Sequence, residues 1–484
     1  MQHTGAVFRS AYPLLGSRTS HSCRTSSRPR GPGSPFPGSH SCYLPDASEY
    51  LRVMQQRWRR GRDKVRGARS LASKGIQVVQ EHGVKELYEA ARLYGDNRFR
   101  SRVSRLPGGR IPPAAGAGWP LSVLIVAERH LEQCWHYRVQ QKLDALAQLG
   151  VPAWAASLSD PAEAITRLQL ASVLVVYRQP DGPQLRAVLA EARRLRIPVV
   201  YELDDAMYRR DLLVDNPNFD TIPRGLRRQV EADADEILSA MRQADHVLAS
   251  TELLAADMAR HVRGDAFVVA NGVDDTMLSI GRGVEIERAA GTLGVEQESL
   301  IVIYGSGSRA HDADLALAGP ALAGLLAEHP RAKLRLVGPL ALPVDLHPFS
   351  AQVERLAELN YGEYLREIAR ADIAIAPLLD SGMNQFKSNI KFLEASLVGV
   401  PVVASPTVYG ETIVDGVTGL IARNPREWRD QLERLTADPG LRKALVAAAA
   451  RDLNRAKLSN GPAHQLSAML HALHPRGVAA GSAA

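Results

Sequence analysis

The residues from Lys387 to Glu394 have the types and spacing of an anion-binding site. Ser388 is a candidate N-cap, and a helix that begins there places Lys391 and Glu394 one turn apart on the same face. The two lysines and the free N–H groups of the first turn would attract a diphosphate, because a helix N-terminus carries partial positive charge. Glu394, one turn deeper, could accept hydrogen bonds from a ribose.

The same charges could also form an ordinary exposed helix face, on which such pairs contribute only about 0.2–0.5 kcal/mol each. The residues that follow favour the binding interpretation. They predict an apolar helix end at Gly399 and then a short buried strand at Pro401–Ala404. The charged helix is therefore expected to lie between elements of a sheet rather than free on a surface.

A glycine-rich loop forms a second candidate for phosphate binding, directly after a predicted strand and before a predicted helix. Glycines permit close backbone approach to a phosphate, and Ser308 or Arg309 could donate hydrogen bonds to it. A plain tight turn explains the Gly-x-Gly pattern equally well, and the full G-x-G-x-x-G pattern of a hydride cofactor is absent. The candidate residues of this loop are Gly305, Ser306, Gly307, Ser308, Arg309 and His311.

Three charged residues of the first half are candidates for contacts with a second substrate. Arg138 begins a predicted helix, and Asp204 and Asp205 follow a predicted strand. Carboxylates at the carboxyl end of a parallel strand could orient an acceptor hydroxyl, although they could equally cap the next segment. No further oxygen ligands accompany the Asp204-Asp205 pair, so we expect no metal site.

The elements that position these residues alternate between short apolar runs and helical patterns. Predicted strands are 122–127, 172–177, 198–202, 246–250, 266–270, 300–304, 333–337, 373–377, 401–404 and 418–421, and predicted helices are 139–149, 183–195, 229–244, 252–261, 315–328, 361–370, 388–398, 425–436, 439–453 and 463–473. This alternation predicts an α/β fold of two Rossmann-like, doubly wound domains facing a cleft, at 118–277 and 278–456, followed by a C-terminal helix and tail at 457–484.

The N-terminal region differs from the rest in composition. The chain of 484 residues has a net charge of +7, yet the first 110 residues hold 21 Lys and Arg against 7 Asp and Glu. Residues 1–45 are rich in Ser, Arg, Pro and Gly and are expected to be disordered, and residues 46–117 should form a basic helical segment and linker. This region could meet an anionic membrane surface or be a solvated tail; no aromatic-interleaved basic module suggests nucleic acid.

Composition limits the remaining classes. Hydrophobic residues make up 45% and charged residues 23%, as in soluble globular proteins. No apolar run reaches the roughly 18 residues that span a bilayer, and the first residues do not resemble a secretory signal, so we expect a cytoplasmic protein that is at most peripheral on the inner face of the membrane. Three scattered cysteines argue against a disulfide framework or a zinc site. Nucleophile-elbow, Walker-type and His-Glu-x-x-His motifs are also absent.

The segment from Phe386 to Pro406 resembles the donor-binding signature of retaining GT-B glycosyltransferases of the family 4 type (glycosyl transferases group 1), as in bacterial O-antigen and capsule synthesis. The residues from Tyr409 to Gly419 and the Gly-Ser-Gly-Ser-x-x-His-x-x-Asp loop at 305–314 also look like this family. The resemblance implies a second domain that binds a nucleoside diphosphate sugar and a first domain that binds a glycan or lipid-linked acceptor.

The resemblance also implies roles for individual residues. Glu394 would bind the ribose and Lys387 the diphosphate, with Lys387 and Arg309 as the catalytic cations and no metal or cofactor. The other implied donor-binding residues are Gly305, Ser306, Gly307, Ser308, His311, Asn384, Ser388, Lys391 and Glu411. The implied reaction is hexose transfer with retention, for cell-surface polysaccharide synthesis.

One departure from the family pattern leaves other functions open. Many members have a glutamate that touches the donor sugar eight residues before the ribose-binding one, and this chain has Phe386 there. A non-catalytic subunit that binds nucleotide sugar or glycan is therefore the alternative from another class. A GT-B epimerase or phosphorylase, which needs no second sugar acceptor, is a third possibility.

Overall fold

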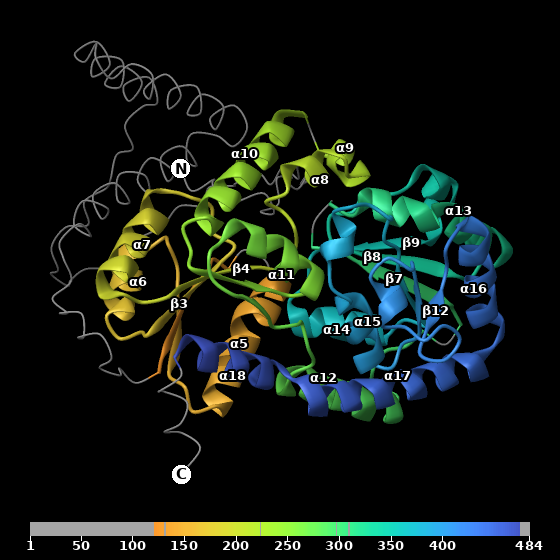
Figure 1. Ribbon diagram of the computed structural model, residues 1–484. Helices are drawn as coiled ribbons and strands as arrows, with labels where there is room; N and C mark the ends of the chain where they lie inside the picture. The colour runs from red at the N-terminus through yellow and green to blue at the C-terminus, as the bar shows by residue number, and fades with distance from the viewer. Residues whose placement is uncertain (1–120, 130–131, 223, 297, 308–309, 475–484) are drawn as a thin grey trace, which may run out of the picture. The chain divides into compact units, whose positions relative to one another are not determined.

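The computed structural model describes residues 121–129, 132–222, 224–296, 298–307 and 310–474 (Figure 1). The expected N-terminal segments 1–45 and 46–117 lie outside these residues. The first domain is built on a parallel sheet with the strand order β2-β1-β3-β4-β5-β6. Its strands are β1 Val123–Val126, β2 Ala153–Ala156, β3 Val173–Tyr177, β4 Val199–Leu203, β5 His246–Ala249 and β6 Ala266–Val268. Every residue of β1, β3 and β4 is buried, as expected for strands covered on both faces.

Helices cover both faces of this sheet. They are α4 Glu132–Trp135, η2 His136–Gln140, α5 Gln141–Gln148, α6 Pro161–Leu168, α7 Pro183–Leu195, α8 Arg210–Val214, α9 Pro217–Thr221, α10 Arg224–Met241, α11 Glu252–Met258 and η3 Ala259–His261. The strand β2 and the helices α6, α8 and α9 were not predicted. The β2 sequence AWAA is mostly alanine, which has a low strand propensity. The helices α8 and α9 have five residues each, too few to show a helical period.

The second domain has a parallel sheet of order β12-β11-β10-β7-β8-β9. Its strands are β7 Ile301–Gly305, β8 Lys333–Val337, β9 Val353–Leu356, β10 Ile373–Ala376, β11 Val402–Ala404 and β12 Leu420–Ile421. Counted within the domain this is the doubly wound order 3-2-1-4-5-6, which changes direction between β7 and β10. The sequence did not predict β9, whose Val-Glu-Arg-Leu alternates poorly.

The helices of the second domain pack against its sheet and complete two buried apolar clusters. They are α12 Asp275–Ala289, α13 Asp312–Glu328, η4 Val344–Gln352, α14 Tyr361–Ala369, η5 Asn384–Phe386, α15 Ile390–Leu397, η6 Tyr409–Glu411, α16 Pro425–Ala437 and α17 Pro439–Asn460. α12 occupies a stretch where the sequence predicted only a connection. Asp274 caps it by accepting a hydrogen bond from the Met277 N–H at 2.7 Å, a start signal that the sequence carries.

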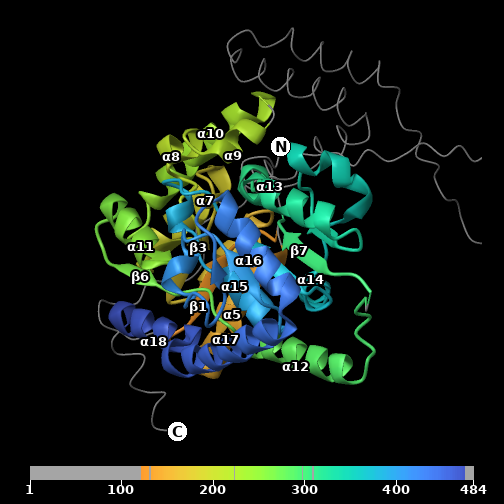
Figure 2. The same cartoon turned by 90° about the vertical axis from the view of Figure 1, so that its right-hand side faces the viewer.

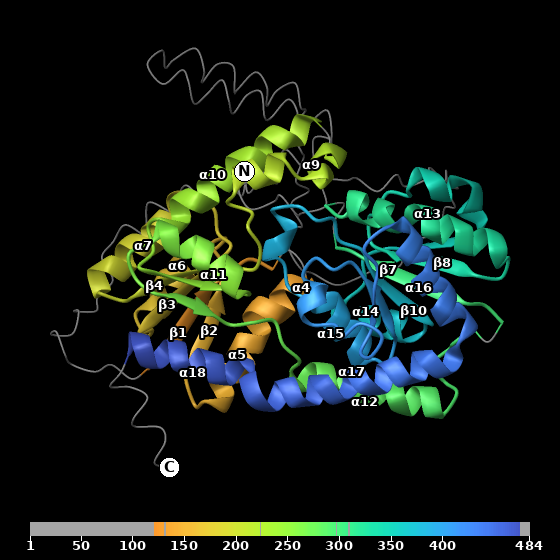
Figure 3. The same cartoon turned by 45° about the vertical axis from the view of Figure 1, so that its right-hand side comes forward.

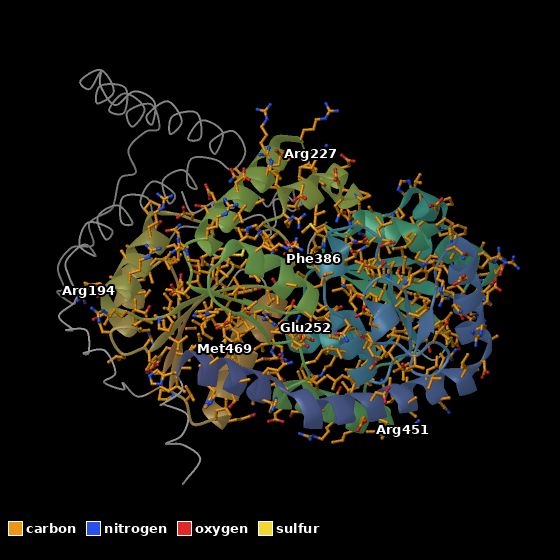
Figure 4. The ribbon with its side chains drawn as sticks, in the orientation of Figure 1. Arg194, Arg227, Glu252, Phe386, Arg451 and Met469 are labelled. Atoms are coloured by element: carbon orange, nitrogen blue, oxygen red, sulfur yellow. The ribbon has the colours of Figure 1, made fainter. Side chains whose placement is uncertain are left out.

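The last helix, α18 (Pro462–Leu473), leaves the second domain and packs on the first (Figure 3). Its residues Leu466, Met469 and Leu470 are buried in one cluster with β1 and β3, and Met469 is labelled in Figure 4. The side chain of Gln465 accepts a hydrogen bond from the Ala270 N–H at 2.9 Å. The chain thus crosses between the domains twice. None of the helices that the structure describes is long and apolar enough to cross a bilayer.

Candidate functional site

The two loops that the sequence singled out lie on either side of the point where the strand order of the second sheet reverses. One follows β7 and the other follows β10, and β7 pairs with β10. Ligands of doubly wound sheets bind outside the carboxyl ends of the strands at such a point. The helix α15, which carries Lys391 and Glu394, lies next to α14 (Figure 2). The topology therefore brings the glycine-rich loop and the charged helix to one place.

Lys391 connects the two loops. Its ammonium donates a hydrogen bond of 2.6 Å to the Gly305 carbonyl and lies 5.1 Å from the centre of the Tyr304 ring. Burial lowers the pKa of Lys391 from its usual value. Gly305 is required here, since a Cβ would lie 2.5 Å from the Tyr364 ring. The Lys391 ammonium has two further N–H groups that do not bind Gly305. These can donate hydrogen bonds to an anionic group at the carboxyl end of β7.

Glu394 is a buried carboxylate that is only half satisfied. Its Oε1 accepts hydrogen bonds from Gln133 Nε2 at 2.8 Å and from the Tyr137 hydroxyl at 3.3 Å. Its Oε2 has no hydrogen-bond partner among the described residues, and the residue is 0% exposed. Burial raises the pKa of Glu394 to about 7. Such an oxygen is costly unless a donor meets it, and a ribose hydroxyl is a donor of suitable size.

The helix that carries these residues begins later than the sequence predicted. α15 starts at Ile390 with Asn389 in the N-cap position and no side-chain cap, so the prediction of Ser388 as N-cap was wrong. The Ser388 hydroxyl instead accepts a hydrogen bond of 2.8 Å from Asn271 Nδ2 in the segment that joins the domains. Lys387 precedes the helix, and its ammonium lies 3.9 Å from the Asp205 carboxylate of the first domain.

A buried carboxylate, Asp314, holds the glycine-rich loop to the loop after β10. Its Oδ2 lies 2.7 Å from His311 Nδ1, and its Oδ1 accepts hydrogen bonds from the Leu379 N–H at 2.9 Å and Asn384 Nδ2 at 3.1 Å. Burial alone would raise the pKa of Asp314, but His311, the Leu379 N–H and the charge of Lys387 together keep it below its usual value. Burial lowers the pKa of His311. The predicted donor residues His311 and Asn384 are thus brought together around Asp314.

The remaining predicted donor residues lie around the same edge. The Ser306 N–H donates to the Val337 carbonyl at 2.9 Å, which continues the ladder of β7 beyond its last residue. Gly338 lies so close that a Cβ there would be 1.9 Å from the Ser306 carbonyl oxygen. Gly307 follows in a bend, and Glu411 is exposed at the end of η6. The predicted residues Ser308 and Arg309 lie outside the described residues.

A turn next to η6 holds Val408 in an unfavourable conformation. Its φ is +68° and ψ is −47°, and the Tyr409 N–H donates to the Thr407 carbonyl at 2.8 Å across it. This is a γ-turn of the rarer hand, which is strained for a β-branched residue. Strain of about 1–3 kcal/mol at one residue persists only where surrounding packing imposes it, and it occurs mainly at functional sites.

The three predicted residues of the first domain separate in the structure. Asp204 and Asp205 lie at the carboxyl end of β4; Asp204 is 3.6 Å from the Arg178 guanidinium, and Asp205 faces Lys387. Arg138 does not take the predicted acceptor-side position, because its guanidinium is 0% exposed and pairs with Glu202 at 2.7 Å. Among the described residues no group of three or more His, Cys, Asp or Glu side chains could hold a metal ion.

Phe386, which replaces the expected sugar-binding glutamate, points away from the donor loops. Together with Met383 it belongs to the buried apolar cluster of the first domain that contains Leu203 and Leu254. The Thr251 hydroxyl also donates a hydrogen bond of 3.2 Å to the Phe386 carbonyl. Figure 4 shows Phe386 between the two domains. Where the family pattern has a glutamate, this chain therefore has an aromatic residue that makes an apolar contact between the two domains.

Phe386→Leu should consequently lower stability rather than change the choice of sugar. We expect a loss of about 1 kcal/mol in the free energy of unfolding, since one apolar side chain of smaller volume replaces another in a packed site. Urea unfolding would measure this loss, and the relative rates with different donor sugars should stay within about twofold. A changed sugar preference with unchanged stability would contradict the observed direction of the side chain.

Two Rossmann-like domains whose facing edges carry these residues define the GT-B architecture. Residues 299–438 match the family model of glycosyl transferases group 1, so this part of the chain carries a domain of that family. Over 237 residues the chain is 30% identical to a D-inositol 3-phosphate glycosyltransferase of Streptomyces bingchenggensis and 32% identical to one of Actinosynnema mirum. These matches cover 44% and 45% of this chain and 50% and 53% of the relatives, so the chain spans about half the length of the curated relatives it matches.

A solved structure supports the fold across both domains. The sucrose-phosphate synthase of Thermosynechococcus elongatus superposes with a TM-score of 0.51 at 13% identity, over 73% of this chain and 99% of that chain. The likeness extends over nearly the whole of that protein. It agrees with the predicted pair of doubly wound domains.

Several residues of the site carried no usable signal in the sequence. Gln133 and Tyr137 reach Glu394 from the first domain, and Asn218 reaches Asp314. Tyr361 supports this arrangement, since its hydroxyl lies 2.9 Å from that of Tyr137. Side chains that act across two domains have no fixed spacing along the chain. Asp314 differs from these residues, because it lies one helical turn after His311 and ends the loop motif at 305–314 that the sequence singled out.

Proposed function

We propose that this protein is a glycosyltransferase that moves a hexose from a nucleoside diphosphate sugar to an acceptor hydroxyl. The observation that carries the proposal is the half-satisfied carboxylate of Glu394, one helical turn from the half-buried ammonium of Lys391 and beside the loop after β7. A nucleoside diphosphate offers what both groups need: ribose hydroxyls for Glu394 and phosphate oxygens for the lysines.

In the proposed reaction the bond between the anomeric carbon and the diphosphate oxygen breaks, and a bond to the acceptor oxygen forms. The acceptor proton leaves with the diphosphate, and the configuration at the anomeric carbon is retained. Lys387, Lys391 and the N-terminus of α15 supply the positive charge that stabilises the departing diphosphate. The predicted contribution of Arg309 concerns a residue outside the described part of the chain.

The first domain is proposed to hold the acceptor. The carboxylates of Asp204 and Asp205 lie at the end of β4, and Asp205 faces Lys387 at 3.9 Å, which is a suitable place to orient a hydroxyl. The acceptor classes to test are glycans and lipid-linked sugars of cell-surface polysaccharide synthesis. D-inositol 3-phosphate is a further candidate, because both curated relatives are named for it. The predicted membrane contact of the basic N-terminal region lies outside the described residues.

The test is a panel of nucleoside diphosphate sugars combined with these acceptors, with release of the diphosphate and transfer to the acceptor both measured. Transfer with one donor supports the proposal, and nuclear magnetic resonance of the product reports retention or inversion. Tight binding of a nucleoside diphosphate without transfer or donor hydrolysis would favour a non-catalytic subunit. Sugar release or epimerisation without an acceptor would favour the other enzymes of this architecture.

We expect the transfer rate to be unchanged by removal of divalent metals. The proposed charge on the diphosphate is balanced by lysine ammonium groups and backbone N–H groups, which need no metal. Rates measured after treatment with EDTA, and again after addition of Mg²⁺ or Mn²⁺, should agree within about twofold. A loss on chelation that Mg²⁺ restores would show that the donor enters as a metal complex.

A further inference from the structure

A short helix of the first domain reaches the donor loops of the second. Figures 1 and 3 show α9 between α10 and α13, and α9 and α13 are in contact. Asn216 caps α9 by accepting a hydrogen bond of 2.9 Å from the Asn218 N–H, and the Thr221 hydroxyl donates to the Asn218 carbonyl at 2.7 Å. The backbone that carries Asn218 is therefore fixed within its own domain.

Asn218 uses both ends of its amide on the second domain. Its Nδ2 donates to Asp314 Oδ2 at 3.0 Å, and its Oδ1 accepts from the Ala313 N–H at 2.8 Å. The side chain is nearly completely buried. Because donor and acceptor are both used, the amide has one orientation, and the contact fits only one relative position of α9 and the start of α13.

Asp314 connects Asn218 to both donor loops through hydrogen bonds of its carboxylate. Its carboxylate also holds His311 in the glycine-rich loop, and Leu379 and Asn384 in the loop after β10. Asp314 is 0% exposed, so loss of the Asn218 amide would leave a buried carboxylate with one donor fewer. The loops on both sides of the donor position would then lose part of their support.

We propose that Asn218 is a positioning residue that couples the contact between the domains to binding of the donor diphosphate. The inference rests on the proposed function. Asn218 does not touch the donor; it holds Asp314, and Asp314 holds the two loops that surround the diphosphate. Binding of the diphosphate and contact between the domains thereby strengthen each other.

Asn218→Ala should weaken binding of the nucleoside diphosphate about tenfold, as expected for the loss of one hydrogen bond to a charged group. Titration calorimetry with UDP, GDP and ADP identifies the best ligand of the wild type, and that ligand is then used on all variants. Asp220→Asn is the matched control: it changes an exposed residue two positions along α9 that faces away from Asp314, and its affinity should equal that of the wild type.

A pair of substitutions separates positioning from a general effect on folding. Asn218→Asp faces the Asp314 carboxylate and should bind the ligand more weakly than Asn218→Ala, because two carboxylates then share one site. Adding Asp314→Asn restores one donor between the two side chains, and the double variant should bind the ligand more tightly than Asn218→Asp alone. Thermal unfolding of each variant checks that it is folded, and Asn218→Ser replaces any variant that is not.

Two results overturn the proposal. The first is that Asn218→Ala binds the diphosphate with the same affinity as the wild type. The second is that the double variant Asn218→Asp with Asp314→Asn binds it no better than Asn218→Asp alone. Failure of the proposed function looks different: the wild type itself would then bind none of the three diphosphates. A wild type that binds and an Asn218→Ala variant that binds equally well would reject the positioning role alone.

Discussion

Lys387→Ala should reduce kcat/KM for sugar transfer about 100-fold or more. Lys387 precedes the N-terminus of α15, and its ammonium is partly exposed at the edge where the donor diphosphate is proposed to lie. Removing one preorganised group that stabilises transition-state charge typically costs about 10²–10³ in rate. The loss should appear mainly in kcat, because the charge on the departing diphosphate grows as the glycosidic bond breaks.

The control for this prediction is Lys443→Ala, which removes an exposed lysine on α17 in the same domain. It changes the net charge equally and should leave kcat/KM within about twofold. Steady-state rates at saturating and at limiting donor concentrations separate the two parameters. Equal losses in the two variants would show that only the net charge matters, and no loss in Lys387→Ala would remove it from the diphosphate site.

The donor residues of the second domain are held from the first domain at several points. Gln133 donates to Glu394, Asn271 to Ser388 and Thr251 to the carbonyl of Phe386. Arg138 in turn donates to Asn271 at 2.9 Å, so this buried arginine acts on Ser388 through another residue. The predicted donor residues are therefore held in place where the two domains meet.

The sequence predicted the sheets well because buried parallel strands are continuous apolar runs. β3 and β8 were predicted to within one residue, and the order of strands and helices gave the doubly wound class. Elements with weak local signals were missed, including β2 and the two short helices α8 and α9. Their positions depend on packing against neighbours, since five residues do not establish a helical period.

The candidate site was predictable only where its residues are local in sequence. Lys391 and Glu394 share a helix face, and His311 and Asp314 share another, so spacing brought each pair together. Phe386 shows the limit. The family pattern has a sugar-binding glutamate at this position, yet Phe386 ends the short helix η5 ahead of α15, and its aromatic ring packs into the other domain.

Glu394→Gln should weaken binding of the nucleoside diphosphate and at the same time stabilise the protein at alkaline pH. Burial raises the pKa of this carboxyl from 4.5 to about 7, so the folded protein binds more protons than the unfolded chain between these values. Its stability therefore falls as the pH rises through this window. The buried negative charge therefore costs about 3 kcal/mol at pH 8, and a neutral amide would recover part of this cost.

Binding should show the opposite dependence on pH. Ribose hydroxyls donate to the ionised carboxylate, so ligand affinity in the wild type should increase as the pH rises through about 7. In Glu394→Gln that increase should disappear, and the affinity at pH 8 should be about tenfold or more lower. Calorimetric titration and thermal unfolding, both from pH 6 to pH 8.5, measure the two effects on the same samples.

Gln133→Ala separates the two roles of the carboxylate. Gln133 donates to Oε1 of Glu394 and leaves Oε2 untouched, so its loss should raise the pKa of Glu394 further and move the increase in affinity to higher pH.

Loss of affinity in Glu394→Gln with no gain in unfolding temperature at pH 8 would show that the carboxylate is already satisfied without ligand. A gain in stability with unchanged affinity would place the ribose elsewhere. Weaker binding together with higher stability is the result expected if the buried carboxylate of Glu394 destabilises the free protein but is needed to bind the ligand.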